Sequence, residues 1–238
     1  MNVNFDEKGD FLMFLKFLGN GSGFAKSHTG AYFVKDNTIF FLDCSMLNIF
    51  KMVELQKDYS NVYVIMTHLH LDHSSGLGLF AQYAYYVFKK KLNIVVPKQL
   101  LFDVKMLMKI TGIDDSIFNL IVSDEIGIEG VKIKDIPTKH APEIEGKCFG
   151  YKITVDGSNY VYTGDTCCLD DFKEYLWDCC ELYIDVSANY GRVHLKYDDI
   201  KDELINLKIP VFLMHLDDEN AIREKIVNDG NIHVAEIE

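Results

Sequence analysis

The sequence has few prolines and few basic residues. Only four prolines occur in 238 residues, and 24 lysines and arginines stand against 36 aspartates and glutamates, which gives a formal net charge of −12. Such a chain has no general attraction to nucleic acid or to anionic membranes, so large polyanionic substrates are disfavoured. The low proline content and 48% hydrophobic residues argue against a disordered or fibrous chain. We predict one globular domain that spans residues 1–238.

Disulfide and zinc-ribbon patterns are also missing. Six cysteines occur, but four of them form the adjacent pairs Cys167-Cys168 and Cys179-Cys180, and no C-x-x-C spacing is present. The chain lacks an apolar run long enough to cross a bilayer, and residues 1–8 lack the basic and apolar regions of a secretory signal. We therefore expect a reduced, cytoplasmic protein without membrane association.

Apolar segments predict strands first and interleaved helices later. An apolar run from Phe11 to Leu18 precedes a glycine-rich turn, and residues after Gly76 have helical spacing. Further strands are predicted at residues 31–34, 39–42, 62–66, 131–136, 149–155, 160–162, 182–186, 210–214 and 232–237. Further helices are predicted at residues 169–176, 197–207 and 219–227. This order predicts an α/β fold of two packed sheets with helices outside.

The strongest chemical signal is the segment Thr67-His68-Leu69-His70-Leu71-Asp72-His73, which directly follows the predicted strand 62–66. Three imidazoles and one carboxylate lie within six residues, and these nitrogen and oxygen donors suit zinc, manganese or iron. A solvated loop with chance histidines is the alternative, but the density of donors argues against it. The segment could supply ligands to two metal ions.

This segment resembles the HxHxDH signature of the metallo-β-lactamase superfamily, and later residues follow in that family's order. Asp43, His140, Asp165 and His215 each come just after an apolar strand-like segment. The resemblance covers nearly the whole chain. It implies the αββα sandwich of that superfamily, in which two packed mixed β-sheets carry helices on their outer faces.

By this resemblance, the chain would bind two divalent metal ions. Residue by residue, it assigns His68, His70 and His140 to one metal, Asp72, His73 and His215 to the other, and Asp165 to a bridging position. Asp43 would orient the ligands. We expect zinc, with manganese as the alternative. Two adjacent cations lower the pKa of a shared water, so hydrolysis is the expected reaction; a redox-active iron site with similar ligands is the alternative.

His194 indicates which branch of the superfamily the chain resembles. It lies between Asp165 and His215, and the preceding Ile184-Asp185-Val186-Ser187 resembles the acidic motif of the phosphodiesterase branch that includes ribonuclease Z. The resemblance implies that His194 contacts the phosphate or protonates the leaving oxygen, with Asp185 orienting it. An imidazole is suited to this role because its ordinary pKa is about 6.5. The expected catalytic residues are thus His194, Asp185 and the ligand Asp72.

The chain departs from ribonuclease Z in one important respect. The long arm that grips transfer RNA usually lies between the residues that match His140 and Asp165, and here only 24 residues separate them. Together with the acidic charge, this shortness favours a small phosphodiester over a large RNA. The compact plan is similar to that of cyclic-nucleotide phosphodiesterases, among them anti-Pycsar enzymes, which degrade cyclic pyrimidine messengers. That resemblance also implies a homodimer.

Two other functions stay open from the sequence. One is a ribonuclease Z-like RNA 3′-processing endonuclease that grips its substrate with another surface. The other is a lactone, thioester or β-lactam hydrolase, which needs the metal site and an oxyanion stabiliser but no acid for a phosphate leaving group.

Overall fold

Two β-sheets form the centre of the computed structural model, which describes residues 13–227 and 229–238. Within these residues the first sheet has six strands in chain order: β1 (Lys16–Gly19), β2 (Gly30–Lys35), β3 (Thr38–Leu42), β4 (Asn61–Ile65), β5 (Leu92–Val96) and β6 (Phe118–Val122). The first residues of the predicted apolar run, 11–12, and the segment 1–8 lie outside the described residues.

The second sheet has the strand order β12-β11-β10-β9-β8-β7. Its strands are β7 (Val131–Pro137), β8 (Phe149–Val155), β9 (Ser158–Tyr162), β10 (Cys179–Asp185), β11 (Val211–Met214) and β12 (Ile232–Val234). Both sheets are mixed, because β1 to β3 and β7 to β9 pair antiparallel whereas the other neighbours pair parallel.

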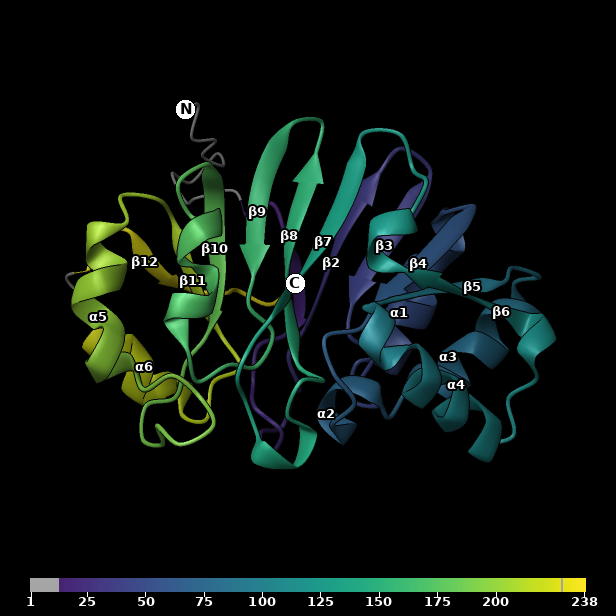
Figure 1. The fold of residues 1–238 in the computed structure, drawn as a ribbon, viewed down its shortest axis with the longest axis horizontal. Coiled ribbons are helices and arrows are strands. Elements are labelled where there is room, and N and C mark those ends of the chain that lie inside the picture. The colour runs from purple at the N-terminus through teal and green to yellow at the C-terminus, as the bar shows by residue number, and fades with distance from the viewer. Residues whose placement is uncertain (1–12, 228) are drawn as a thin grey trace.

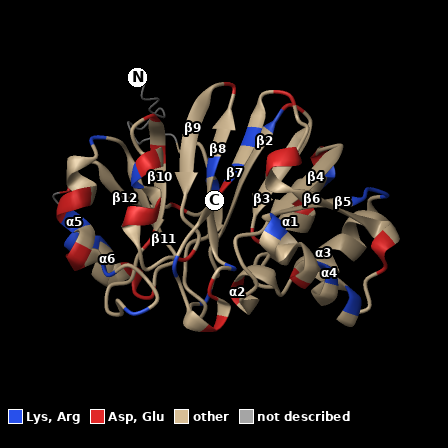
Figure 2. Cartoon of the chain, viewed as in Figure 1, with Lys and Arg blue, Asp and Glu red and all other residues tan. Residues whose placement is uncertain are grey.

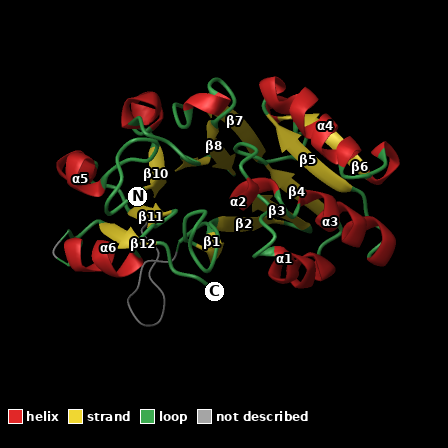
Figure 3. Ribbon diagram, turned by 90° about the horizontal axis from the view of Figure 1, so that it is seen from below, coloured by secondary structure: helices red, strands yellow, loops and turns green. Residues whose placement is uncertain are grey.

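Helices cover the outer faces of the two sheets, as Figures 1 and 3 show. The first sheet carries α1 (Ile49–Leu55), α2 (Leu71–Ser74), α3 (Leu77–Gln82) and α4 (Leu101–Ile110); the second carries α5 (Tyr197–Asn206) and α6 (Glu219–Lys225). Acidic and basic residues are interspersed along these outer helices (Figure 2). The predicted αββα sandwich is confirmed. None of the helices in the described part of the chain is long and apolar enough to span a membrane.

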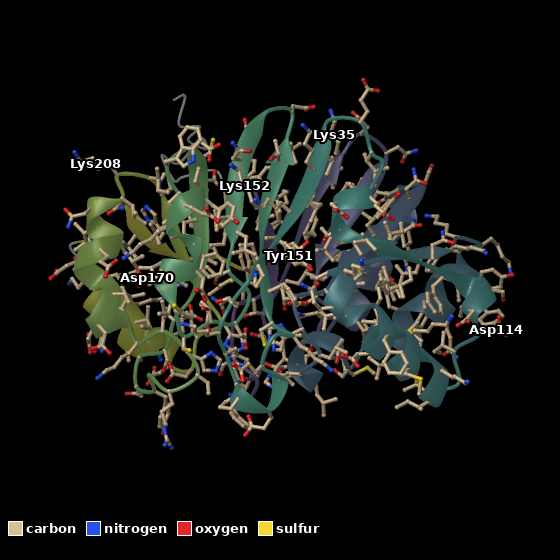
Figure 4. The ribbon with its side chains drawn as sticks, viewed as in Figure 1. Lys35, Asp114, Tyr151, Lys152, Asp170 and Lys208 are labelled. Atoms are coloured by element: carbon tan, nitrogen blue, oxygen red, sulfur yellow. The ribbon has the colours of Figure 1, made fainter. Side chains whose placement is uncertain are left out.

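Aromatic and β-branched side chains fill the space between the sheets. Phe33 and Phe40 of the first sheet stack with ring centroids 4.6 Å apart, and they belong to the same buried cluster as Tyr151 and Tyr183 of the second. All five residues of β3 are buried, as expected for a strand covered on both faces. Tyr151, labelled near the centre of Figure 4, donates a hydrogen bond to the Met66 carbonyl and so ties the sheets together.

The helical prediction for residues 169–176 needs one refinement. This segment is a 3₁₀ helix, η7 (Leu169–Tyr175), rather than an α-helix. The helix that begins after Gly76 continues beyond α3 as a π-helical segment, η2 (Tyr83–Val87). The 3₁₀ helix is wound more tightly than an α-helix and the π-helix more widely. The spacing of apolar residues does not distinguish these forms from the predicted α-helix.

Candidate metal centre

The carboxyl ends of parallel strands bring the candidate residues to one edge of the sandwich. In Figure 1 this is the lower edge, where α2 lies. Asp43 follows β3, the segment 67–73 follows β4, and His215 follows β11. Asp43 (φ 62°) and His215 (φ 58°) have left-handed backbone conformations, which residues other than glycine rarely adopt. Such local strain persists only where the surrounding structure imposes it, and it gathers at functional sites.

One group of converging side chains contains three histidines and one aspartate. His70 Nδ1 lies 3.1 Å from His68 Nε2 and 3.3 Å from His140 Nε2. Asp165 Oδ2 lies 3.8 Å from His68 Nε2 and 3.6 Å from His140 Nε2. One donor atom from each of these four residues falls within 4.8 Å of the others. The structure thus brings together the residues expected to hold the first metal ion.

A second group shares Asp165 with the first. His73 Nε2 lies 3.3 Å from both Asp72 Oδ2 and Asp165 Oδ1. His215 Nε2 lies 3.2 Å from Asp72 Oδ2 and 3.3 Å from Asp165 Oδ2. Asp165 therefore contributes a carboxylate oxygen to both groups of potential metal donors.

The hydrogen bonds of the histidines test whether this arrangement fits a metal. The carbonyl of Val193 can only accept, so His140 Nδ1 donates to it over 2.7 Å and His140 Nε2 presents a lone pair to the centre. His73 Nδ1 donates to Asp43 Oδ2 over 2.7 Å, and its buried Nε2 has no hydrogen-bond partner. This nitrogen faces two carboxylates, so without a metal ion it carries a proton, and with one it can present its lone pair to the cation. The donor set therefore fits divalent metal ions.

Electrostatics at the centre agree with this fit. Burial lowers the pKa of His68 well below its ordinary value, which keeps this imidazole neutral as a metal ligand must be. Burial opposes ionisation of Asp165, but the charges of His215 and His73 outweigh it and hold the pKa of Asp165 well below the usual range. Burial likewise opposes protonation of His73, yet Asp165 and Asp43 raise its pKa well above 6.5. The centre strongly favours positive charge.

Asp43 lies behind the converging side chains, as the sequence predicts. Its Oδ1 accepts a hydrogen bond from the Thr67 backbone N–H and its Oδ2 one from the Thr67 hydroxyl, both over 2.8 Å. The same Oδ2 accepts the 2.7 Å bond from His73. Asp43 therefore fixes both the start of the histidine segment and the ring orientation of His73.

His194 and Asp185 form a pair at the side of this centre. Asp185 Oδ2 lies 2.8 Å from His194 Nδ1 and also accepts a 2.9 Å hydrogen bond from the Thr166 backbone. The His194 ring centroid lies 5.0 Å from that of His140 and 4.9 Å from that of His215. Burial lowers the pKa of His194, but Asp185 outweighs this effect and the pKa is raised. Asp185, His194 and His215 also form a third cluster of potential metal donors.

Other contacts at the centre were not predicted. The Val193 carbonyl holds His140, but a backbone carbonyl leaves no signal in the sequence. Asp217 accepts hydrogen bonds from the Ser187 hydroxyl and the Ala188 backbone, and so holds the segment that leads to His194. Its place two residues after His215 is a signal that could have identified it. Gly23 packs so closely on Asp72 that an added Cβ would lie 2.8 Å from Oδ2.

Comparison with known proteins places the chain in a family. A family model described as anti-Pycsar protein Apyc1 matches residues 13–237. The metallo-β-lactamase fold protein YhfI from Bacillus subtilis is 19% identical with a TM-score of 0.76, over 93% of this chain and 95% of that chain. A diphosphatase of the PhnP family is 17% identical with a TM-score of 0.72, over 94% of both chains.

The short form of human tRNase Z shares the fold as well, with 14% identity and a TM-score of 0.68 over 94% of this chain and 96% of that chain. The comparison with curated proteins gave no match. The fold likeness and the family model agree with the resemblance predicted from the histidine segment. The chain is a metallo-β-lactamase-fold hydrolase and belongs to the anti-Pycsar protein Apyc1 family.

Proposed function

We propose that this protein is a binuclear metal-dependent phosphodiesterase that hydrolyses a small nucleotide, most specifically a cyclic nucleotide. The observation that carries the proposal is the His194–Asp185 pair beside two donor groups that share Asp165. A metal centre alone suits many hydrolases, but a paired imidazole next to it suits a reaction whose leaving alkoxide needs a proton. Membership of the anti-Pycsar family supports a cyclic nucleotide as the substrate.

The seven proposed ligands lie at the same edge of the sandwich, with Asp72 and His73 in the short helix α2 and the other five in loops. His68, His70 and His140 would hold one ion, Asp72, His73 and His215 the other, and Asp165 both. When bound, the metal pair supplies a nucleophilic hydroxide at neutral pH and offsets negative charge on the phosphate. Asp72 would be catalytic in this sense, because it keeps the second site in place beside the shared carboxylate.

The proton for the leaving oxygen would come from His194. Asp185 accepts from Nδ1, so Nε2 is the nitrogen that can deliver a proton outside the pair. In a 3′,5′-cyclic nucleotide the leaving oxygen stays attached to the ribose. His194 would protonate that oxygen as the phosphorus–oxygen bond breaks, and Asp185 would stabilise the imidazolium before transfer.

Zinc is the proposed metal and manganese the alternative, because the donors are imidazole nitrogens and carboxylate oxygens without a thiolate. We also propose a homodimer, which rests on the resemblance to cyclic-nucleotide phosphodiesterases. A cytoplasmic location is supported by the cysteines, all six of which are free thiols.

A hydrolysis panel tests the function. Purified protein, loaded with zinc or manganese, is given 2′,3′- and 3′,5′-cyclic nucleotides, bis(p-nitrophenyl) phosphate, a transfer RNA precursor and a lactone. We expect cleavage of the small phosphodiesters that EDTA abolishes and His194→Ala strongly reduces, with the RNA left intact. His233→Ala, which changes a histidine on β12, serves as the matched control.

Each competing function gives a different result in this panel. Cleavage of the precursor at its 3′ end would favour a ribonuclease Z-like endonuclease. Hydrolysis of the lactone by both wild type and His194→Ala, with every phosphodiester intact in metal-loaded protein, would overturn the proposal in favour of a lactone or thioester hydrolase.

A further inference from the structure

A pocket of about 280 Å³ opens beside His194. Two segments of the candidate site form part of its wall: Cys167 and Cys168 closely follow Asp165, and the stretch from Gly191 to Lys196 contains His194. None of the seven proposed metal ligands lines it. The pocket therefore lies next to the metal centre, on the side of the proposed proton donor.

The position of His194 determines which part of a substrate would enter this pocket. In an in-line displacement at phosphorus, the nucleophile and the leaving oxygen lie on opposite sides. If His194 protonates the leaving oxygen, the group that carries this oxygen lies on the His194 side. In a 3′,5′-cyclic nucleotide the group that carries the leaving oxygen is the nucleoside itself. Its base can therefore enter the adjacent pocket.

The lining of the pocket combines an apolar surface with an acidic rim. Its apolar residues are Leu169, Leu195 and Ile200, all of them buried. A flat base can pack on such a surface. The rim carries Asp170, Asp199 and Glu203, with Lys196 the basic residue among the lining side chains. A carboxylate in this lining can accept from a hydrogen-bond donor of the substrate.

Asp199 is the rim carboxylate that is available to a ligand. Lys173 Nζ forms ion pairs with Asp170 over 2.6 Å and with Glu203 over 3.0 Å, so these two carboxylates already have a partner. Asp170, labelled in Figure 4, belongs to η7. Asp199 makes no ion pair within the described part of the chain. Its Oδ2 would lie 3.8 Å from a Cβ at Gly191, which places the oxygen beside that glycine in the pocket wall.

We propose that this pocket binds the base of the cyclic nucleotide and that Asp199 selects bases with an exocyclic amino group. The amino group donates to the carboxylate, whereas a carbonyl in the same place would meet it with like partial charge. Cytosine and uracil separate these cases, because they have the same shape and differ at position 4, where one has an amino group and the other a carbonyl. The inference rests on the proposed function and names the base subsite of that same centre.

The test compares cytidine and uridine 3′,5′-cyclic phosphates as substrates. We expect wild-type kcat/KM to be about tenfold higher for the cytidine compound, the effect of one hydrogen bond to a charged group at a partly exposed site. In Asp199→Asn this ratio should fall to about one, because an amide offers both a donor and an acceptor. Asp202→Asn, on the same exposed helix but outside the pocket, should keep the wild-type ratio.

Binding of the non-hydrolysable phosphorothioate analogues, followed by calorimetry on metal-loaded protein, gives a second measurement that needs no turnover. Equal affinities and equal kcat/KM for the two bases in the wild type would overturn the inference. So would a preference that survives in Asp199→Asn. If the protein hydrolyses neither compound but binds the cytidine analogue preferentially through Asp199, the base subsite is supported and the proposed phosphodiesterase activity fails.

Discussion

Asp185 and His194 form a partly buried carboxylate–imidazole pair, with Asp185 Oδ2 and His194 Nδ1 2.8 Å apart. The Asp185 side chain is completely inaccessible, whereas one fifth of the His194 side chain is exposed. The aspartate is held in turn by the Thr166 backbone N–H. Such a pair fixes the tautomer and the orientation of the imidazole and leaves its other nitrogen free to act.

We predict that Asp185→Asn lowers kcat for a cyclic nucleotide by about 10- to 100-fold. The amide has nearly the same shape, but it cannot stabilise the imidazolium of His194 as the carboxylate does. Steady-state kinetics measure the effect, and metal analysis of the same samples provides the control. A loss of bound metal in proportion to the loss of kcat would contradict this prediction, because Asp185 would then support metal binding through His215, whose Nδ1 lies 3.4 Å from Asp185 Oδ1.

Metal removal should destabilise the fold. A metal present at 100 times its dissociation constant stabilises the native state by about 2.7 kcal/mol, which corresponds to roughly 5–10 °C in the melting temperature of a chain of this size. We expect EDTA-treated protein to melt lower by this amount and to recover with zinc. Asp165→Ala should abolish the zinc-dependent shift and lower the bound metal below two ions per chain. An unchanged stoichiometry of two would contradict the bridging role of Asp165.

The gathering of the candidate metal-binding residues could be predicted because these residues obey a simple rule of chain order. His68, His70, Asp72 and His73 come from one short segment, and each of the distant residues follows an apolar strand. Parallel strands place their carboxyl ends at one edge of a sheet, so these residues had to gather there. Asp43 could be predicted to reach this edge for the same reason, since β3 pairs parallel with β4, whereas its place behind the proposed ligands was implied by the family resemblance.

Other features depend on long-range packing and left no local pattern. The bond from His140 to the Val193 carbonyl joins residues 53 positions apart and uses a backbone atom that every residue has. The strands β5 and β6 and helix α4 were not predicted, because short apolar runs fit a strand and a buried helix equally well. The base pocket beside His194 arises only when η7 and α5 come together, which sequence spacing does not reveal.

Two buried tyrosines in the sheet core should respond oppositely to loss of their hydroxyl groups. Tyr151 donates to the Met66 carbonyl, whereas the buried hydroxyl of Tyr162 has no hydrogen-bond partner in the described part of the chain. We expect Tyr151→Phe to lower the free energy of unfolding by about 1–3 kcal/mol, because it leaves the Met66 carbonyl without this hydrogen-bond donor. Tyr162→Phe should be neutral or stabilising. Urea denaturation measures both, and equal losses in the two variants would contradict this assignment.

The carboxyl group of Glu181 should make stability depend on pH. It accepts hydrogen bonds from the Phe14 backbone N–H and from the Tyr183 hydroxyl, yet burial raises its pKa above the ordinary 4.5. Between 4.5 and the raised value the folded chain binds more protons than the unfolded chain, so stability falls as pH rises through that window.

Glu181→Gln removes this titration and keeps an acceptor, so its free energy of unfolding relative to wild type should increase from pH 4 to pH 7. Denaturant unfolding at both pH values measures the change, with Glu224→Gln on the exposed helix α6 as the control. If the free energies of unfolding of wild type and Glu181→Gln differed by the same amount at pH 4 and pH 7, burial of Glu181 would not disfavour its charged form.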